Sequence, residues 1–199
     1  MIKNPIQDVT DKSQYRAIGI VKGIYKPNNL DQLNRGTLTD KEGNIIETVI
    51  LGKALSLIKK YINLESDYFW IVYPRNKNTN SLHLQVAGIW DPYKLNQVDT
   101  NVSEKDPDEI LEELNLNNNY FSIRGELIYV NSQKKEVVIK ICSSPTSKRL
   151  KNPTFKIIVE GEISLKFLNN FVSLDVIRDG NTLRMVKCEI IDKNKSAKS

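Results

Sequence analysis

Short runs of alternating apolar and polar positions recur along the first half of the chain. The run at residues 15–25 (YRAIGIVKGIY) alternates and is rich in β-branched and aromatic residues, which predicts a long strand. Its two glycines, Gly19 and Gly23, are typical of the bulges and bends that closing a small barrel requires. Further strands are expected at residues 36–39, 45–51, 68–73 and 82–90, separated by polar turns.

One segment of this half changes from strand to helix periodicity. Residues 53–63 have apolar positions at helical spacing and polar residues on the other side, which predicts an amphipathic helix. The expected order β-β-β-α-β-β is that of the OB-fold, a small five-stranded, partly open barrel. An SH3-like barrel is the main competitor, but it offers no place for this helix.

The second half is again dominated by strand patterns. Strands are expected at residues 121–130, 136–141, 155–161, 171–178 and 183–191, with a hairpin turn at residues 179–181 (DGN). Only residues 164–169 could supply a helical turn at the place of the first helix. The predicted fold class is therefore mainly β, with tandem small OB-like barrels.

A short acidic segment separates the two halves. Residues 1–98 have a net charge of +4, residues 99–119 of −6 and residues 120–199 of +7. Asp106 followed by Pro107 and two further acids is a strong start signal for a helix. We therefore predict an OB-like barrel at 1–98, an acidic linker helix at 99–119, a second barrel at 120–192 and a flexible tail at 193–199.

Bulk properties leave the function open but narrow its class. The net charge of +5 and the pI near 9.0 are compatible with an anionic partner without requiring one. Cys142 and Cys188 lie in apolar runs, which favours two buried thiols in a reducing compartment, although a single disulfide stays open. No signal-peptide pattern and no membrane-spanning run is present, so we expect a cytoplasmic protein without a membrane partner.

Catalytic and metal-binding patterns are weak. The single histidine, His83, lies in an alternating strand with no second His or Cys at ligand spacing. Gly52-Lys53 fails the phosphate-loop pattern because residue 54 is Ala and the position five before Gly52 is Glu47. The clustered carboxylates fall on the predicted acidic helix, which favours a solvated face. We expect no enzyme, no metal site and no cofactor.

Several stretches of the first half carry a resemblance. They are YRAIGIVKGIYKP (residues 15–27), RGTL (35–38), FWIVYPR (69–75) and LHLQVAGIWDP (82–92). Together they resemble a conserved but uncharacterised family of cyanobacterial proteins. The resemblance covers about the first half and implies a cytoplasmic protein of a photosynthetic lineage, without an assigned activity.

Basic and aromatic residues gather in the loops that border the ligand face of an OB-fold. Cations there can neutralise phosphates, and aromatic rings can stack on bases. The candidate nucleic-acid-binding residues are Tyr25, Lys26, Arg35, Tyr73, Arg75 and Lys77 in the first half, and Lys134, Lys135, Lys148, Arg149, Lys151, Arg178 and Arg184 in the second. The leading hypothesis is a non-catalytic module that binds single-stranded nucleic acid, RNA more than DNA. The alternative is a protein-interaction or assembly factor that docks on a larger complex.

Overall fold

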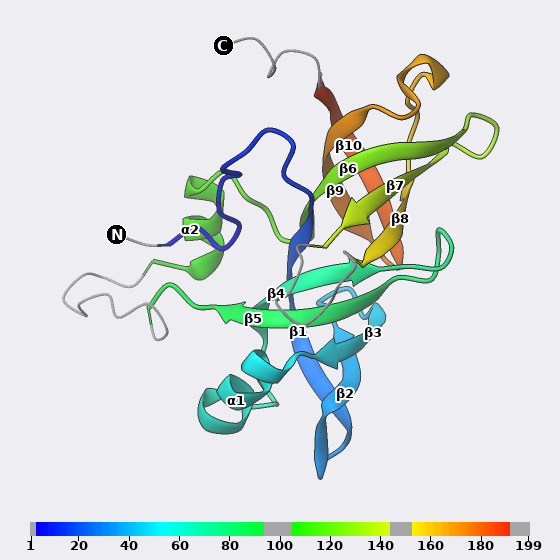
Figure 1. Cartoon of the computed structure of the whole chain (residues 1–199). Helices are drawn as coiled ribbons and strands as arrows, with labels where there is room; N and C mark the ends of the chain where they lie inside the picture. Colours follow the sequence, from blue (N-terminus) through cyan, green and yellow to red (C-terminus); the bar gives the residue numbers. More distant parts are fainter. Residues whose placement is uncertain (1–2, 94–104, 144–152, 192–199) are drawn as a thin grey trace. The chain divides into compact units, whose positions relative to one another are not determined.

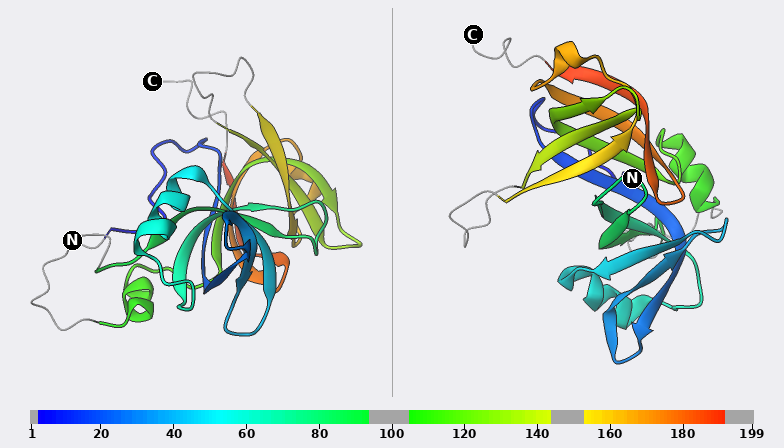
Figure 2. Two further views of the ribbon diagram at one scale, coloured as in Figure 1. Left: turned by 90° about the horizontal axis from the view of Figure 1, so that it is seen from below. Right: turned by 90° about the vertical axis from the view of Figure 1, so that its right-hand side faces the viewer.

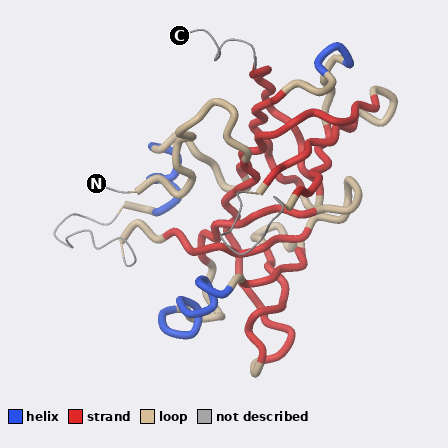
Figure 3. The backbone as a smooth tube through the Cα atoms, in the orientation of Figure 1, coloured by secondary structure: helices blue, strands red, loops and turns tan. Residues whose placement is uncertain are grey.

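The structure is a computed structural model that describes residues 3–93, 105–143 and 153–191 (Figure 1). The chain divides into two compact units. The first unit comprises Met1–Gln7, Gly19–Tyr73 and His83–Tyr120, and the second comprises Asp8–Ile18, Pro74–Leu82 and Phe121–Ser199. Strands are the main regular secondary structure of both units, as Figure 3 shows. The two units are therefore interleaved in sequence, because two segments of the N-terminal half, Asp8–Ile18 and Pro74–Leu82, belong to the second unit.

The first unit has five strands in OB-fold order. Its strands are β1 (Arg16–Asn29), β2 (Gln32–Thr39), β3 (Ile45–Ile50), β4 (Tyr68–Arg75) and β5 (His83–Trp90), and its helices are α1 (Gly52–Tyr61) and α2 (Pro107–Glu113). The hydrogen-bonded order is β2-β3-β5-β4-β1, and a further β1–β2 pairing returns to the start. β3 and β5 pair in parallel, with α1 between β3 and β4 in sequence. The predicted OB-like fold is confirmed.

Close contact between β1 and β2 depends on a glycine that the sequence singled out. A Cβ at Gly23 would lie 2.5 Å from the carbonyl oxygen of Thr39, far inside van der Waals contact. β1 continues to Asn29, with a bulge between Pro27 and Asn29, so it is longer than the predicted strand. Glycine thus permits the strong coiling of β1 that lets it pair with both β2 and β4.

The acidic helix packs within the first unit. Asp106 accepts a hydrogen bond from the N–H of Asp108 and Pro107 opens the helix, as predicted. Ile110 and Leu111 are buried, and the Lys22 ammonium lies 2.5 Å from the Asp108 carboxylate. Part of the negative charge of this segment is therefore neutralised by β1.

The second unit repeats the same strand order. Its strands are β6 (Tyr120–Asn131), β7 (Glu136–Cys142), β8 (Thr154–Glu160), β9 (Phe171–Asp179) and β10 (Thr182–Ile191), with the 3₁₀ turn η1 (Leu165–Phe167) between β8 and β9. The order is β6-β7-β8-β10-β9, and β6 also pairs with β9. β8 and β10 pair in parallel at Arg184 and Glu160, and Figure 2 lets the curvature of each strand set be followed. The turn η1 replaces the longer α1 of the first unit.

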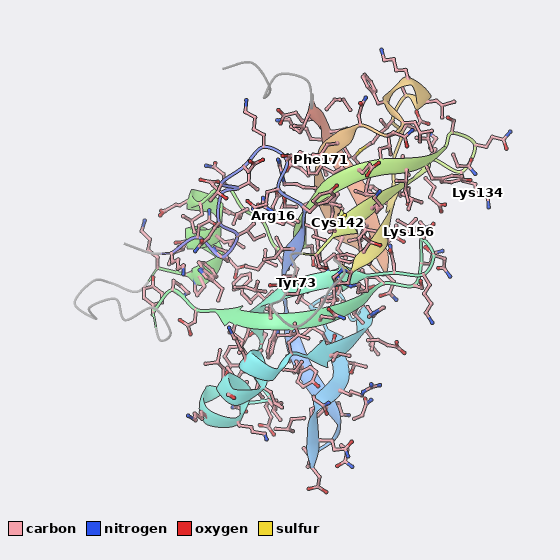
Figure 4. The ribbon with its side chains drawn as sticks, in the orientation of Figure 1. Arg16, Tyr73, Lys134, Cys142, Lys156 and Phe171 are labelled. Atoms are coloured by element: carbon pink, nitrogen blue, oxygen red, sulfur yellow. The ribbon has the colours of Figure 1, made fainter. Side chains whose placement is uncertain are left out.

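An N-terminal segment completes the second unit. The Arg124 guanidinium donates hydrogen bonds to the carbonyl oxygens of Lys12 (2.5 Å) and Gln14 (3.3 Å). Arg16 donates to the Ser122 hydroxyl at 2.8 Å, and Figure 4 labels Arg16. These contacts explain why residues preceding β1 pack with strands from the other end of the sequence.

Candidate nucleic-acid interface

The outer side of β6, β7 and β8 forms a sheet face at the place where OB-folds bind oligonucleotides. Strand register defines its members, because Val137, Ile139 and Ile141 are buried and the residues between them point outward. We call this surface the second face. Its residues are Glu126, Tyr129, Asn131, Glu136, Val138, Lys140, Cys142, Thr154, Lys156, Ile158 and Glu160, so acids as well as lysines belong to it.

A stacking platform lies in the middle of the second face. Tyr129 is 46% exposed, which is unusual for a large aromatic side chain within a strand. It pairs with Val138, and Val138 pairs with Ile158 on the next strand. This row of one aromatic and two aliphatic side chains gives a nucleobase a flat apolar surface.

Two lysines lie directly opposite each other in the neighbouring row. Lys140 on β7 pairs with Lys156 on β8, so their Cβ atoms are about 5 Å apart. Like charges in directly opposed positions destabilise a sheet. Lys140 is compensated by Glu126 at 2.7 Å, a hydrogen bond that raises the pKa of its ammonium group. Lys156 is exposed and has no ion-pair partner in the described part of the chain.

One end of the second face leads into the basic segment that the sequence singled out. Cys142 pairs with Thr154, and the N–H of Ser143 donates to the carbonyl oxygen of Pro153 at 2.9 Å. Figure 4 labels Cys142 and Lys156 on these two strands. The predicted contacts Lys148, Arg149 and Lys151 fall between these anchor points and lie outside the described residues.

Charges at the other end largely cancel. Lys134 and Lys135 are exposed in the β6–β7 turn, and Lys135 lies 3.5 Å from Glu162. Arg184 is within ion-pair distance of Asp179 at 3.1 Å and of Glu160 at 3.6 Å. These three predicted residues are accessible, but two of them already have acidic neighbours.

The equivalent surface of the first unit has a different character. We call it the first face; its residues are Ile24, Lys26, Arg35, Thr37, Thr39, Ile45, Glu47 and Val49. The structure brings the predicted Lys26 and Arg35 together there, both exposed. However, an acid lies in the same row as Lys26, because Thr37 pairs with Lys26 on one side and with Glu47 on the other. None of the residues of the first face is aromatic.

Tyr25 was expected to stack on bases, and this expectation is wrong. Only 1% of Tyr25 is exposed, and its ring packs against Trp70 at 5.9 Å. The hydroxyl donates to the carbonyl oxygen of Leu33 at 2.8 Å, and burial raises the pKa of Tyr25 to about 12. The alternation of β1 places position 25 on the same side as the buried Val21, so the tyrosine belongs to the core.

The predicted contact at Arg178 is wrong for the same reason. Arg178 is 3% exposed, and its guanidinium donates to the carbonyl oxygen of Gly180 at 2.7 Å, which fixes the β9–β10 turn.

Tyr73 is half-buried on β4, away from the β2–β3 pair, and its role stays a prediction (Figure 4).

Arg75 and Lys77 belong to the second unit rather than the first. Arg75 is the last residue of β4 and Lys77 lies in the β4–β5 loop, and both fall in Pro74–Leu82 of the second unit. The Arg75 guanidinium stacks 3.6 Å from the centre of the Phe155 ring, so this cation is engaged in packing. Lys77 is exposed.

The three most informative residues of the second face are not among the contacts predicted from the sequence, because those candidates are taken mainly from loops. Tyr129, Lys140 and Lys156 all lie within strands. Each lysine stands between two apolar residues in its strand, Ile139 and Ile141 for Lys140 and Phe155 and Ile157 for Lys156, which indicates that both lysines point away from the core. This signal was sufficient to find them.

Catalytic and metal-binding constellations have no support in the described ranges. No group of three or more His, Cys, Asp or Glu side chains there could hold a metal ion. Among the same residues, no helix is long and apolar enough to cross a membrane. Both cysteines are free and half-buried, rather than paired.

Comparison with protein families identifies the class. Residues 17–97 match the model of the N-terminal OB-fold domain of the PatR RNA-binding protein. Residues 123–192 match the model of a cyanobacterial OB-fold-like RNA-binding domain, C-terminal. Together the matches cover most of the chain, which therefore carries two OB-fold domains of RNA-binding families and is a nucleic-acid-binding module.

These matches also bear on the resemblance and on catalysis. They confirm the cyanobacterial OB-fold family suggested by the first half and extend it to the second. Both descriptions name binding domains rather than enzymes, in agreement with the prediction of a non-catalytic protein. No curated protein matches the chain.

Proposed function

We propose that the chain binds single-stranded RNA on the second face. The observation that carries the proposal is the opposed pair Lys140 and Lys156 on β7 and β8, which correspond to the strands that OB-folds use for oligonucleotides. The exposed Tyr129 lies beside them on β6. A base stacks on Tyr129 and its aliphatic neighbours. The adjacent phosphate is neutralised mainly by Lys156, because Lys140 is already paired with Glu126.

We expect the basic residues between Cys142 and Thr154 in the sequence to add phosphate contacts. Lys148, Arg149 and Lys151 are connected through short stretches of chain to the Cys142–Thr154 end, where the lysine pair also lies. The cationic side of the site is therefore this end. Lys134, Lys135 and Arg184, whose charges are mostly compensated, make a weaker contribution, and so do Lys26, Arg35 and Tyr73 of the first unit.

Binding is tested by fluorescence anisotropy with the full chain. The probe is a labelled oligo(U) of about 12 nucleotides, within the site size of one OB-fold. Single-stranded RNA is expected to bind more tightly than DNA of the same sequence or an RNA duplex. The logarithm of the affinity should fall with the logarithm of salt by about 0.7 per neutralised phosphate. Failure to bind any single strand at low salt would remove the proposal.

Docking on a protein complex is a second candidate function with one observation in its favour. Ile24 (41% exposed) and Ile45 (61% exposed) flank Thr39 on the first face, where solvent-facing side chains are normally polar. A partner that co-purifies in stoichiometric amounts after nuclease treatment, and is lost in Ile45→Asp, would support docking. Equal recovery with the variant would count against it.

A further inference from the structure

The side chain of Asn76, on the β4–β5 loop, makes the backbone hydrogen bonds to β8 that a neighbouring strand would otherwise make. Parallel pairing of β8 with β10 is limited to Glu160 and Arg184, so the backbone of β8 is open before that point. Asn76 fills the gap: its amide Nδ2 donates to the carbonyl oxygen of Ile158 at 2.7 Å, and its Oδ1 accepts from the Ile158 N–H at 3.0 Å. Both polar groups of one strand residue are thus satisfied by one side chain.

Three further contacts fasten the same loop within the second unit. Arg75 stacks on Phe155, the Thr79 hydroxyl donates to the Glu136 carboxylate, and the Thr182 hydroxyl donates to Asn80 Oδ1 at 2.9 Å. The anchors lie on β8, β7 and β10, so the loop crosses three strands. Within the loop, the N–H groups of Lys77 and Asn78 both donate to Ser81 Oγ at 2.8 Å. The loop is therefore held at both ends and ordered internally.

The hydrogen bonds of Asn76 hold the β4–β5 loop, which carries Lys77, against β8. Ile158 is a member of the second face, and the residue after its partner Asn76 is Lys77. Lys77 is exposed and has no ion-pair partner among the described residues. The loop residues on either side of Lys77 contact Ile158 and Glu136, and Glu136 lies opposite Glu160, so a cation in this loop would offset the repulsion of a phosphate by these two acids.

We propose that Asn76 is a positioning residue for RNA binding: it holds the β4–β5 loop on β8 so that Lys77 contacts the RNA backbone at the edge of the second face. The β4–β5 loop lies in sequence within the N-terminal OB-fold match, but in this proposal it contributes to RNA binding by the second unit. This inference rests on the proposed function and adds a contact from a distant part of the sequence.

A double-mutant cycle on the full chain tests the inference, with the oligo(U) probe and a salt titration. Lys77→Ala is expected to weaken binding a few-fold and to reduce the salt slope by about 0.7, the value for one phosphate on a single strand. Asn76→Ala should reduce the slope equally, and the double variant should lose no more than either single one. Asn63→Ala, in a loop of the first unit where Asn63 accepts from the Glu65 N–H, is the control and should bind as the unchanged protein does.

The outcomes separate this inference from the proposed function. If the unchanged protein binds RNA but Lys77→Ala keeps the full salt slope, Lys77 makes no phosphate contact and the inference fails alone. Independent, multiplying effects of the two substitutions would show that Asn76 does not act through Lys77. Should Asn76→Ala unfold the second unit, Thr79→Val removes the Glu136 anchor instead. A reduced salt slope in Thr79→Val supports positioning by the loop, and an unchanged slope overturns it.

Discussion

The two units share one strand order but present different side chains on the same surface. The first face exposes Ile24 and Ile45 and has one acid, Glu47, in the row of Lys26. The second face exposes Tyr129 and has two lysines, Lys140 and Lys156, in the same row as one acid, Glu126. The fold supplies a three-strand surface in both cases, and the residues on it are what distinguish the proposed RNA site from the other surface. The comparison also separates two tyrosines that look alike in sequence, since Tyr25 is buried and Tyr129 is exposed.

The largest effect is expected for Tyr25→Ala, and it is an effect on stability. Removing a fully buried aromatic ring costs about 3–5 kcal/mol in the free energy of unfolding. Both tryptophans, Trp70 and Trp90, lie in the first unit, so their fluorescence during denaturant unfolding reports on this unit. Tyr25→Phe keeps the ring and loses only the hydrogen bond to Leu33, at a cost of about 1 kcal/mol. Equal stability of Tyr25→Ala and the unchanged protein would show that Tyr25 is not a core residue.

Alkaline pH should give a second test of the burial of Tyr25. The pKa of Tyr25 is raised from 10.0 to about 12 in the folded chain, so the folded state holds this proton more tightly than the unfolded state. The associated stability is complete below pH 10 and is lost as pH rises towards 12, by about 2–3 kcal/mol. Comparing unfolding curves of the unchanged protein and Tyr25→Phe across this range isolates the contribution. Parallel pH profiles for the two proteins would contradict it.

Tyr129→Ala is expected to act on RNA binding instead of stability. Loss of one stacked base costs about 1–3 kcal/mol, which corresponds to a roughly 5- to 150-fold weaker affinity for the oligo(U) probe. Tyr129→Phe should bind almost normally, because the ring and not the hydroxyl makes the stack. An unchanged affinity in the alanine variant would mean that bases do not stack at this position.

The smallest expected effect on RNA binding comes from removing single cations, Lys156 on the second face and Arg35 on the first. Lys156→Ala should weaken binding a few-fold and lower the salt slope by about 0.7, since one phosphate contact is lost. Arg35→Ala on the first face should leave the slope nearly unchanged, and Lys59→Ala on the exposed side of α1 serves as the control. A larger loss for Arg35→Ala than for Lys156→Ala would reverse the assignment of the two faces.

Local patterns were sufficient to predict most of the fold. The expected helix at 53–63 is α1 at Gly52–Tyr61, and the Asp106-Pro107 signal marks the true start of α2. The DGN turn joins β9 and β10, with Asp179 paired to Thr182. These features follow from short-range sequence, because periodicity, caps and turn residues act over a few positions.

The candidate site was harder to predict, for two physical reasons. Charge and ring type do not reveal burial, so Tyr25 and Arg178 were mistaken for surface residues although their strands alternate correctly. The assignment of the β4–β5 loop to the second unit depends on contacts of Asn76, Thr79 and Asn80 with residues 57 to 102 positions away. Long-range pairing of this kind leaves no local pattern in the sequence.

Protection of Cys142 from alkylation tests RNA binding on the second face most directly. Cys142 lies on this face beside the lysine pair, whereas Cys188 is half-buried on β10, where it pairs with Leu174, and serves as an internal control in the same molecule. Saturating oligo(U) is predicted to slow modification of Cys142 and to leave the rate at Cys188 unchanged. Equal Cys142 rates with and without bound RNA would contradict the account.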